Sequence, residues 1–115
     1  MCALCHDIGK VISIEGHPEI AAALLRPYVS DGVYQIVRTH QDFQGKWYYN
    51  YLGRPTNLRD QYVALPWYNQ AVTFTDEWDQ ISFDPTFKTQ PLDYFEPLVR
   101  QMFAKPTFRP PTVCT

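Results

Sequence analysis

The chain has 115 residues, a size that fits one domain with a single hydrophobic core. Its formal net charge is −2, so it lacks the basic surplus that general nucleic-acid-binding proteins usually carry. No run of ~20 apolar residues is present to cross a bilayer, and the start of the chain has no signal-peptide pattern. We therefore expect a cytoplasmic protein that binds neither nucleic acid nor membrane.

The three cysteines are Cys2, Cys5 and Cys114. An odd number without a repeated spacing argues against a disulfide framework and favours a reducing compartment. Cys2 and Cys5 have the Cys-x-x-Cys spacing of redox and zinc sites. No second cysteine pair accompanies them, so we interpret them as small apolar side chains on a helix face.

The first part of the chain predicts two helices separated by a loop. Residues 2–8 are expected to form the end of a helix, with Gly9 as its C-terminal stop. Residues 11–16 are the expected loop. A second helix is predicted over 18–26, because a proline fits its first turn and Pro27 ends it.

A third helix is predicted to begin after Ser30, a good N-cap residue, with Asp31 in its first turn. Its apolar positions recur at helical spacing and place His40 on the buried face at the end of the helix. The members of this stripe are Val33, Ile36, Val37 and His40. A further helix or helical turn is predicted over 43–52, followed by a turn at 53–57.

The second half predicts a short helix over 58–64 and a longer helix that begins at Pro66. The apolar stripe of the longer helix consists of Trp67, Ala71, Phe74 and Trp78. Asp79 adjoins this stripe, whereas Asp76 and Glu77 are expected to be solvated, since an unpaired charge is expensive to bury.

A last helix is predicted after the turn at 82–85, with Pro97 kinking or restarting it. Its expected stripe is Leu92, Phe95, Val99, Met102 and Phe103. We interpret 1–104 as one domain and 105–115 as an extended, Pro-rich tail. Aromatic residues make up 16% of the chain; we expect most to pack in the core, and a minority to line a pocket or a homodimer surface.

Imidazoles and carboxylates recur along these helices. His6 and Asp7 are adjacent, His17 opens the second predicted helix, and His40 and Asp79 lie in later ones. Neutral imidazoles with carboxylates suit iron, manganese or zinc. Taken alone, His17 is equally compatible with a helix-start position, and His40 with a hydrogen bond to a backbone carbonyl or an aspartate.

The run His6-Asp7-Ile8-Gly9-Lys10 resembles the central motif of the HD superfamily. The resemblance covers most of 2–104 and implies an all-α helical bundle. It also implies a set of metal ligands around two ions, with Asp7 bridging them: His6, Asp7, His17, His40 and Asp79. The family takes one further histidine from an upstream helix, so we expect this chain to lack the first ligand-bearing helix.

The runs 17–27 and 78–80 are most similar to predicted HD phosphohydrolases that include phosphonate-cleaving diiron oxygenases. The resemblance therefore implies a dinuclear iron oxygenase that uses O2 to cleave a small hydroxylated phosphonate-like substrate. One alternative is a phosphohydrolase of phosphate esters or nucleotides that uses manganese or zinc. Another is a vestigial or binding module without catalysis.

Lys10 ends the HD-type motif. In the related inositol oxygenase this lysine helps to hold the substrate at the diiron site, which gives Lys10 a role in catalysis by resemblance. In HD phosphohydrolases the same ammonium can bind a phosphate oxygen. A lysine at this place can also simply complement the C-terminal dipole of a helix.

Overall fold

The computed structural model describes residues 2–86, 88 and 90–106. The fold is all-α, as the sequence predicted, and no described residue lies in a strand. The α-helices are α1 (Cys2–Cys5), α2 (His17–Leu25), α3 (Asp31–Tyr48), α4 (Tyr68–Thr73) and α5 (Leu92–Phe103). The 3-10 segments are η1 (Ile8–Val11), η2 (Arg26–Tyr28), η3 (Tyr49–Leu52), η4 (Leu58–Tyr62) and η6 (Gln80–Phe83), and η5 (Phe74–Asp79) is a π-helix.

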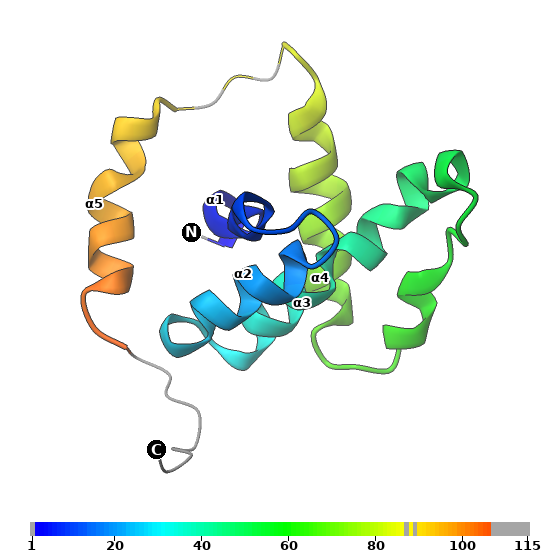
Figure 1. The fold of residues 1–115 in the computed structure, drawn as a ribbon, viewed down its shortest axis with the longest axis horizontal. Helices are drawn as coiled ribbons and strands as arrows, with labels where there is room; N and C mark the ends of the chain where they lie inside the picture. The colour runs from blue at the N-terminus through cyan, green and yellow to red at the C-terminus, as the bar shows by residue number, and fades with distance from the viewer. Residues whose placement is uncertain (1, 87, 89, 107–115) are drawn as a thin grey trace.

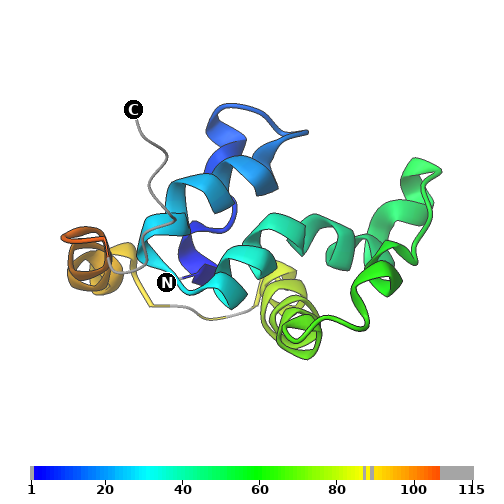
Figure 2. The ribbon, with the colours of Figure 1, turned by 90° about the horizontal axis from the view of Figure 1, so that it is seen from below.

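The helices α2 and α3 pack along each other, and η1 lies on α2. Figure 1 shows α1 between α5 on one side and the helical column of α4, η5 and η6 on the other. Seen from below in Figure 2, α3 runs through the middle of the molecule, while α5 lies at one end and residues 49–66 project at the other. The long helix α3 therefore connects the two halves of the fold.

The starts of α2 and α3 agree with their predicted local signals. Pro18 lies in the first turn of α2. The Ser30 side chain accepts a hydrogen bond from the Val33 backbone N–H at 3.4 Å, at the start of α3. A turn follows η3, where Gly53 adopts a left-handed φ of 67°.

The predicted end of α3 at His40 is wrong, because the helix continues for two further turns to Tyr48. Gly45 lies inside this extension and does not break it. Its absent side chain leaves the space that the Tyr49 ring occupies, and a Cβ on Gly45 would overlap that ring. Gly45 therefore allows the Tyr49 ring to pack against α3 without ending the helix.

The core consists of two clusters that lie on different sides of α3. One contains Cys5, Ala21, Ala22, Leu25, Val29 and Val37. The other contains Ile36, Phe43, Trp67, Ala71 and Phe74. Cys5 is a buried free thiol in the first cluster, in line with its interpretation as a small apolar side chain. Because α3 supplies residues to both clusters, its burial holds the two halves together.

Two predicted apolar stripes are only partly buried. Trp78 contacts Phe74 at the edge of the second cluster but is 59% exposed. On α5, Leu92 is 75% exposed and none of the residues of this helix is fully buried. Only Met102 and Phe103, in its last turn, pack on the first cluster, and the helix runs through Pro97 without a restart. The predicted tail falls largely on Thr107–Thr115, which lie outside the described residues, as does Cys114.

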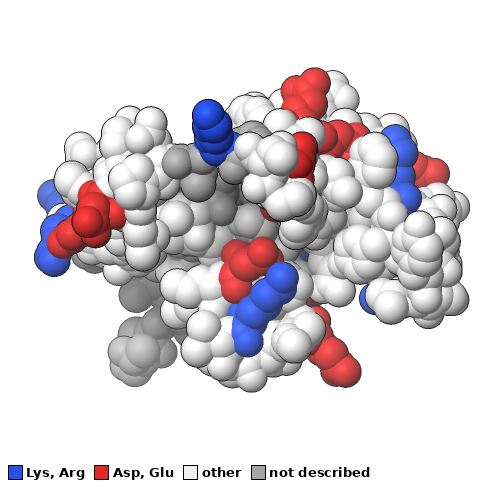
Figure 3. All heavy atoms as spheres, turned by 90° about the horizontal axis from the view of Figure 1, so that it is seen from above, with Lys and Arg blue, Asp and Glu red and all other residues white. Residues whose placement is uncertain are grey.

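The surface carries charges of both signs. On the face drawn in Figure 3, basic and acidic side chains lie in small mixed groups among uncharged residues. Within the described part of the chain, no helix combines the length and apolar character needed to cross a bilayer.

The prediction that Asp76 is solvated is wrong, because its carboxylate is bound by three donors. The Arg59 guanidinium donates to it with Nη1 at 3.1 Å and Nη2 at 2.9 Å, and Trp47 Nε1 donates at 2.9 Å. Arg59 is buried and also donates to the Phe43 carbonyl. Partial burial would raise the pKa of Asp76, but the hydrogen bonds from Arg59 and Trp47 hold it below its usual value. This cluster ties η4 and η5 to α3.

We expect Asp76→Ala to lower the free energy of unfolding by about 2 to 4 kcal/mol, because it leaves the buried Arg59 charge unpaired. Urea denaturation at pH 7 measures this loss. The pKa of Asp76 is lowered in the folded state. The difference in free energy of unfolding between the native chain and Asp76→Ala therefore has its largest value above about pH 4 and decreases below it. The exposed neighbour Glu77→Ala is the control, with an expected change within about 0.5 kcal/mol; equal effects of both substitutions would contradict the assignment.

Candidate metal centre

The structure brings together all six residues that the sequence singled out. His6 and Asp7 lie between α1 and η1, and Lys10 lies in η1. His17 is the first residue of α2, His40 lies within α3, and Asp79 ends the π-helix η5. Residues from five parts of the chain therefore converge on one place, and the longest separation along the sequence is that between His6 and Asp79.

The rings of His17 and His40 are held in the same way. His17 Nδ1 lies 2.7 Å from the Ile14 carbonyl oxygen, and His40 Nδ1 lies 2.6 Å from the Val37 carbonyl oxygen. A carbonyl can only accept a hydrogen bond, so both Nδ1 atoms carry the proton. In the neutral rings, both Nε2 atoms are then left as lone-pair donors to a metal ion, with their orientation fixed.

These two Nε2 atoms face each other and Asp7. They are 3.1 Å apart, and each lies 3.2 Å from Asp7 Oδ1. Ligand atoms bound about 2.1 Å from one ion, at right angles to each other, lie about 3.0 Å apart. Three electron-rich atoms at this spacing repel one another unless a proton or a metal ion lies among them. We call the set of His17, His40 and Asp7 Oδ1 the His17 position.

A second set lies on the other oxygen of the same carboxylate. His6 Nε2 is 3.3 Å from Asp7 Oδ2 and 3.4 Å from Asp79 Oδ1. We call the set of His6, Asp7 Oδ2 and Asp79 the His6 position. Ligand atoms of His6, Asp7 and His40 also lie within 4.8 Å of one another. The Asp7 carboxylate thus joins two sets of side chains whose atoms are of the kind that bind metal ions.

The histidines are buried, and the site opens at Asp7. The side chain of His40 is 1% exposed, whereas that of Asp7 is 42% exposed. Burial opposes a charge on His6, but the hydrogen bonds that His6 donates to Asp7 and Asp79 offset this and raise the pKa of His6 to about 10. Burial likewise opposes ionisation of Asp7, yet His40 and His6 hold the pKa of Asp7 far below its usual range. Burial lowers the pKa of His17 and so favours its neutral, ligating form.

Gly9 lets η1 approach α2. A Cβ on Gly9 would collide with the backbone of His17, at its Cα and carbonyl group. The predicted role of Gly9 as a helix stop is wrong, because Gly9 is buried inside η1. Its role is the close approach that brings Asp7 to His17.

Sequence reasoning missed two residues at this centre. Gln44 donates from Nε2 to Asp79 Oδ2 at 2.8 Å. Phe74 places the edge of its ring against His6, with 5.3 Å between the ring centroids. The one available signal for Gln44 was its position four residues after His40, which puts both side chains on the same face of α3.

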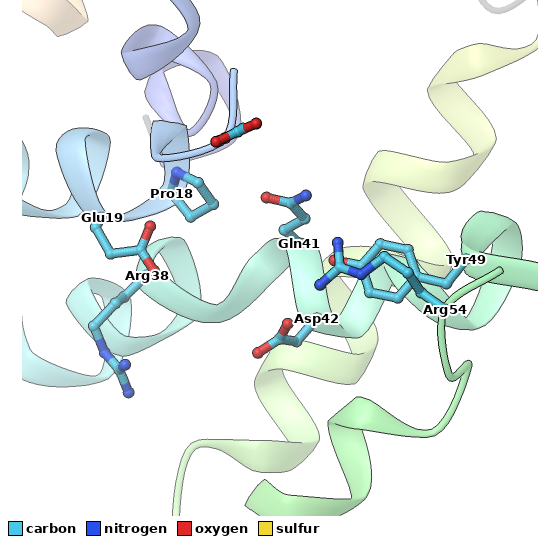
Figure 4. A pocket seen from close by; sticks show the side chains of 8 residues that line it. Pro18, Glu19, Arg38, Gln41, Asp42, Tyr49 and Arg54 are labelled. Atoms are coloured by element: carbon cyan, nitrogen blue, oxygen red, sulfur yellow. The ribbon is translucent and has the colours of Figure 1, made fainter. Parts of the chain in front are cut away.

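A polar pocket of about 410 Å³ lies beside the helices that carry His17 and His40 (Figure 4). Its lining residues are Glu15, Pro18, Glu19, Arg38, Gln41, Asp42, Tyr49 and Arg54. Pro18 follows His17 and Gln41 follows His40 in the chain. The Arg54 guanidinium stacks on the Tyr49 ring at 4.2 Å, so one aromatic residue forms part of a pocket wall, as a minority of them were expected to do.

Comparison with family models, with curated proteins and with solved structures gave no match to this chain. The arguments for its function therefore come from the geometry of the centre.

A divalent ion should stabilise the chain through Asp7. We expect Fe2+, Mn2+ or Zn2+ at 100 times its Kd to add about 2.7 kcal/mol to the free energy of unfolding. Asp7→Ala should abolish this gain, because Asp7 supplies an oxygen to both positions. Thermal unfolding with and without each ion measures the effect. Glu15→Ala, which removes a nearby exposed carboxylate, is the control; the same gain in Asp7→Ala and the native chain would contradict the site.

Proposed function

We propose that this chain is an HD-type metalloenzyme in which His6, Asp7, His17, His40 and Asp79 hold two metal ions. The observation that carries this proposal is the triangle of His17 Nε2, His40 Nε2 and Asp7 Oδ1, with sides of 3.1 to 3.2 Å. Both rings present lone pairs because their Nδ1 protons bind backbone carbonyls.

We further propose that the ions are iron and that the enzyme is an oxygenase acting on a small hydroxylated phosphonate-like substrate. Two histidines and one carboxylate on one face of the metal are typical of non-haem Fe(II) oxygenases. Bound iron would supply the redox chemistry that lets O2 oxidise a substrate C–H bond. The chain contributes the buried imidazoles, which keep water from their side, and an open side at Asp7 through which substrate can approach.

Lys10 is placed to bind the anionic group of such a substrate. Its Nζ lies 3.5 Å from Asp7 Oδ2, and its side chain is 50% exposed. The ammonium group therefore lies at the open side of the centre, and a charge-assisted hydrogen bond from it can orient a phosphonate or phosphate oxygen.

The same position of Lys10 favours a second candidate, a phosphohydrolase of phosphate esters or nucleotides. Imidazole and carboxylate ligands accept manganese or zinc as readily as iron. In that reaction Lys10 would bind a phosphate oxygen next to the ions, and no oxidant would be needed.

Elemental analysis combined with two assays tests the proposal. About two irons per chain, lost in the double variant His6→Ala with Asp7→Ala, together with O2-dependent turnover of hydroxylated phosphonates, is the expected result. Release of phosphate from phosphate esters with Mn2+ under argon would favour the phosphohydrolase over the oxygenase. Failure of the native chain to retain any metal would overturn the enzyme proposal and leave a binding or vestigial module.

We expect Lys10→Gln to raise KM by about 10- to 100-fold, the value of one charge-assisted hydrogen bond. Metal content should stay at the native level, because Lys10 is not a ligand. Steady-state kinetics and elemental analysis of the same sample measure the two effects. Lys46→Gln, on the far part of α3, serves as the control; loss of metal from Lys10→Gln would contradict a role in substrate binding.

A further inference from the structure

Asp79 is presented by an unusual turn of helix. It ends the π-helix η5, which begins at Phe74. In an α-helix, five residues advance the chain by about 500°, which would place Asp79 about 140° away from Phe74. The wider π turn, with hydrogen bonds between residues i and i+5, brings residues five apart to nearly the same face. Both Phe74 and Asp79 consequently contact His6.

Gln44 fixes the Asp79 carboxylate from the opposite side. Its amide Nε2 donates to Asp79 Oδ2 at 2.8 Å, and the other oxygen, Oδ1, faces His6 Nε2 at 3.4 Å. An amide nitrogen can only donate, so Gln44 holds Oδ2 of the carboxylate and leaves Oδ1 directed to the centre. The amide is neutral and leaves the negative charge of Asp79 available to a cation.

A second hydrogen bond between α3 and η5 likewise joins a side-chain donor on α3 to a carboxylate on η5. Trp47 on α3 donates to Asp76 on η5 at 2.9 Å, and Arg59 reinforces that carboxylate. Gln44 and Trp47 lie three residues apart on α3, as do Asp76 and Asp79 on η5. Two parallel donor–carboxylate pairs therefore hold the π-helix against α3, and only the Gln44 pair reaches the metal centre.

The two metal positions have different kinds of support. At the His17 position, both rings are fixed by carbonyl groups three residues earlier in the chain. At the His6 position, Asp79 depends on a partner 35 residues away. We propose that Gln44 is a positioning residue for the His6 position, and that this makes the two positions unequal in affinity. This inference rests on the proposed function, because it requires a centre for two ions.

The expected effect of losing Gln44 is selective. Residues that orient a metal ligand typically change affinity by about 10- to 100-fold. Gln44→Glu keeps the size of the side chain but sets a second carboxylate against Asp79, and Gln44→Met removes the donor without adding charge. Both variants should weaken one ion by about 10- to 100-fold and leave the other ion at its native affinity. Gln35→Leu, on the same helix and bonded to Arg38, is the matched control and should keep both ions.

Titration of the metal-free chain with Co2+, followed by calorimetry and by the visible spectrum, tests the inference. Two ions in the native chain, with one retained and one weakened in both Gln44 variants, is the expected result. Two ions of native affinity in the variants, or equal weakening of both, would overturn the inference while the two-ion centre stands. A native chain that binds no Co2+ would overturn the proposed function and this inference together.

A double-variant cycle keeps the test decisive if one Gln44 variant folds poorly. Asp79→Ala should by itself give the one-ion state, and adding Gln44→Met to it should change Co2+ affinity no further, because the two residues act as one unit. A further loss of affinity in the double variant, larger than about twofold, would show that Gln44 acts by another route and would overturn its assignment. Far-UV circular dichroism of each metal-free variant identifies those that are folded.

Discussion

The Asp7 carboxylate is the group on which the arrangement of the centre depends. Its two oxygens lie 3.2 Å from the imidazoles of His17 and His40 and 3.3 Å from that of His6. One side chain thus links the segment after α1 to α2, to α3 and, through His6, to η5. A carboxylate so surrounded by imidazole nitrogens is stabilised only by protons or cations shared with them. Gly9 permits this contact, because any side chain there would push η1 away from His17.

The long helix α3 connects this centre to the stability of the fold. Ile36 and Val37 belong to different core clusters, while His40 and Gln44, one and two turns later, face the centre. The burial that stabilises α3 therefore also fixes the direction of the His40 ring. The π-helix η5 is the less favourable local geometry, and two of its three carboxylates, those of Asp76 and Asp79, hold it in place through donors on α3 or η4.

The sequence predicted what is determined locally. The starts of α2 and α3 follow from Pro18 and Ser30, whose effects act within one turn, and the residues of the centre were expected from the resemblance of residues 6–10 to the HD motif. Features that depend on distant partners were missed. The position of Gly45 inside α3 depends on the Tyr49 ring that packs against it, and Asp76 was expected to be solvated because its partner Arg59 lies in another element. The role of Gln44 depends on the winding of η5, which no local pattern indicates.

The same distinction between local and distant support divides the centre itself. His17 and His40 take their orientation from carbonyl groups of their own segments, so the geometry of the His17 position persists as long as α2, α3 and η1 remain packed together. The His6 position needs, in addition, the π-helix and its two connections to α3. Opening of η5 costs less than opening of the α2–α3 pair, because η5 adds few residues to the core. If the centre holds two ions as proposed, the His6 position needs η5 to be docked, and an ion bound there would in turn hold η5 in place.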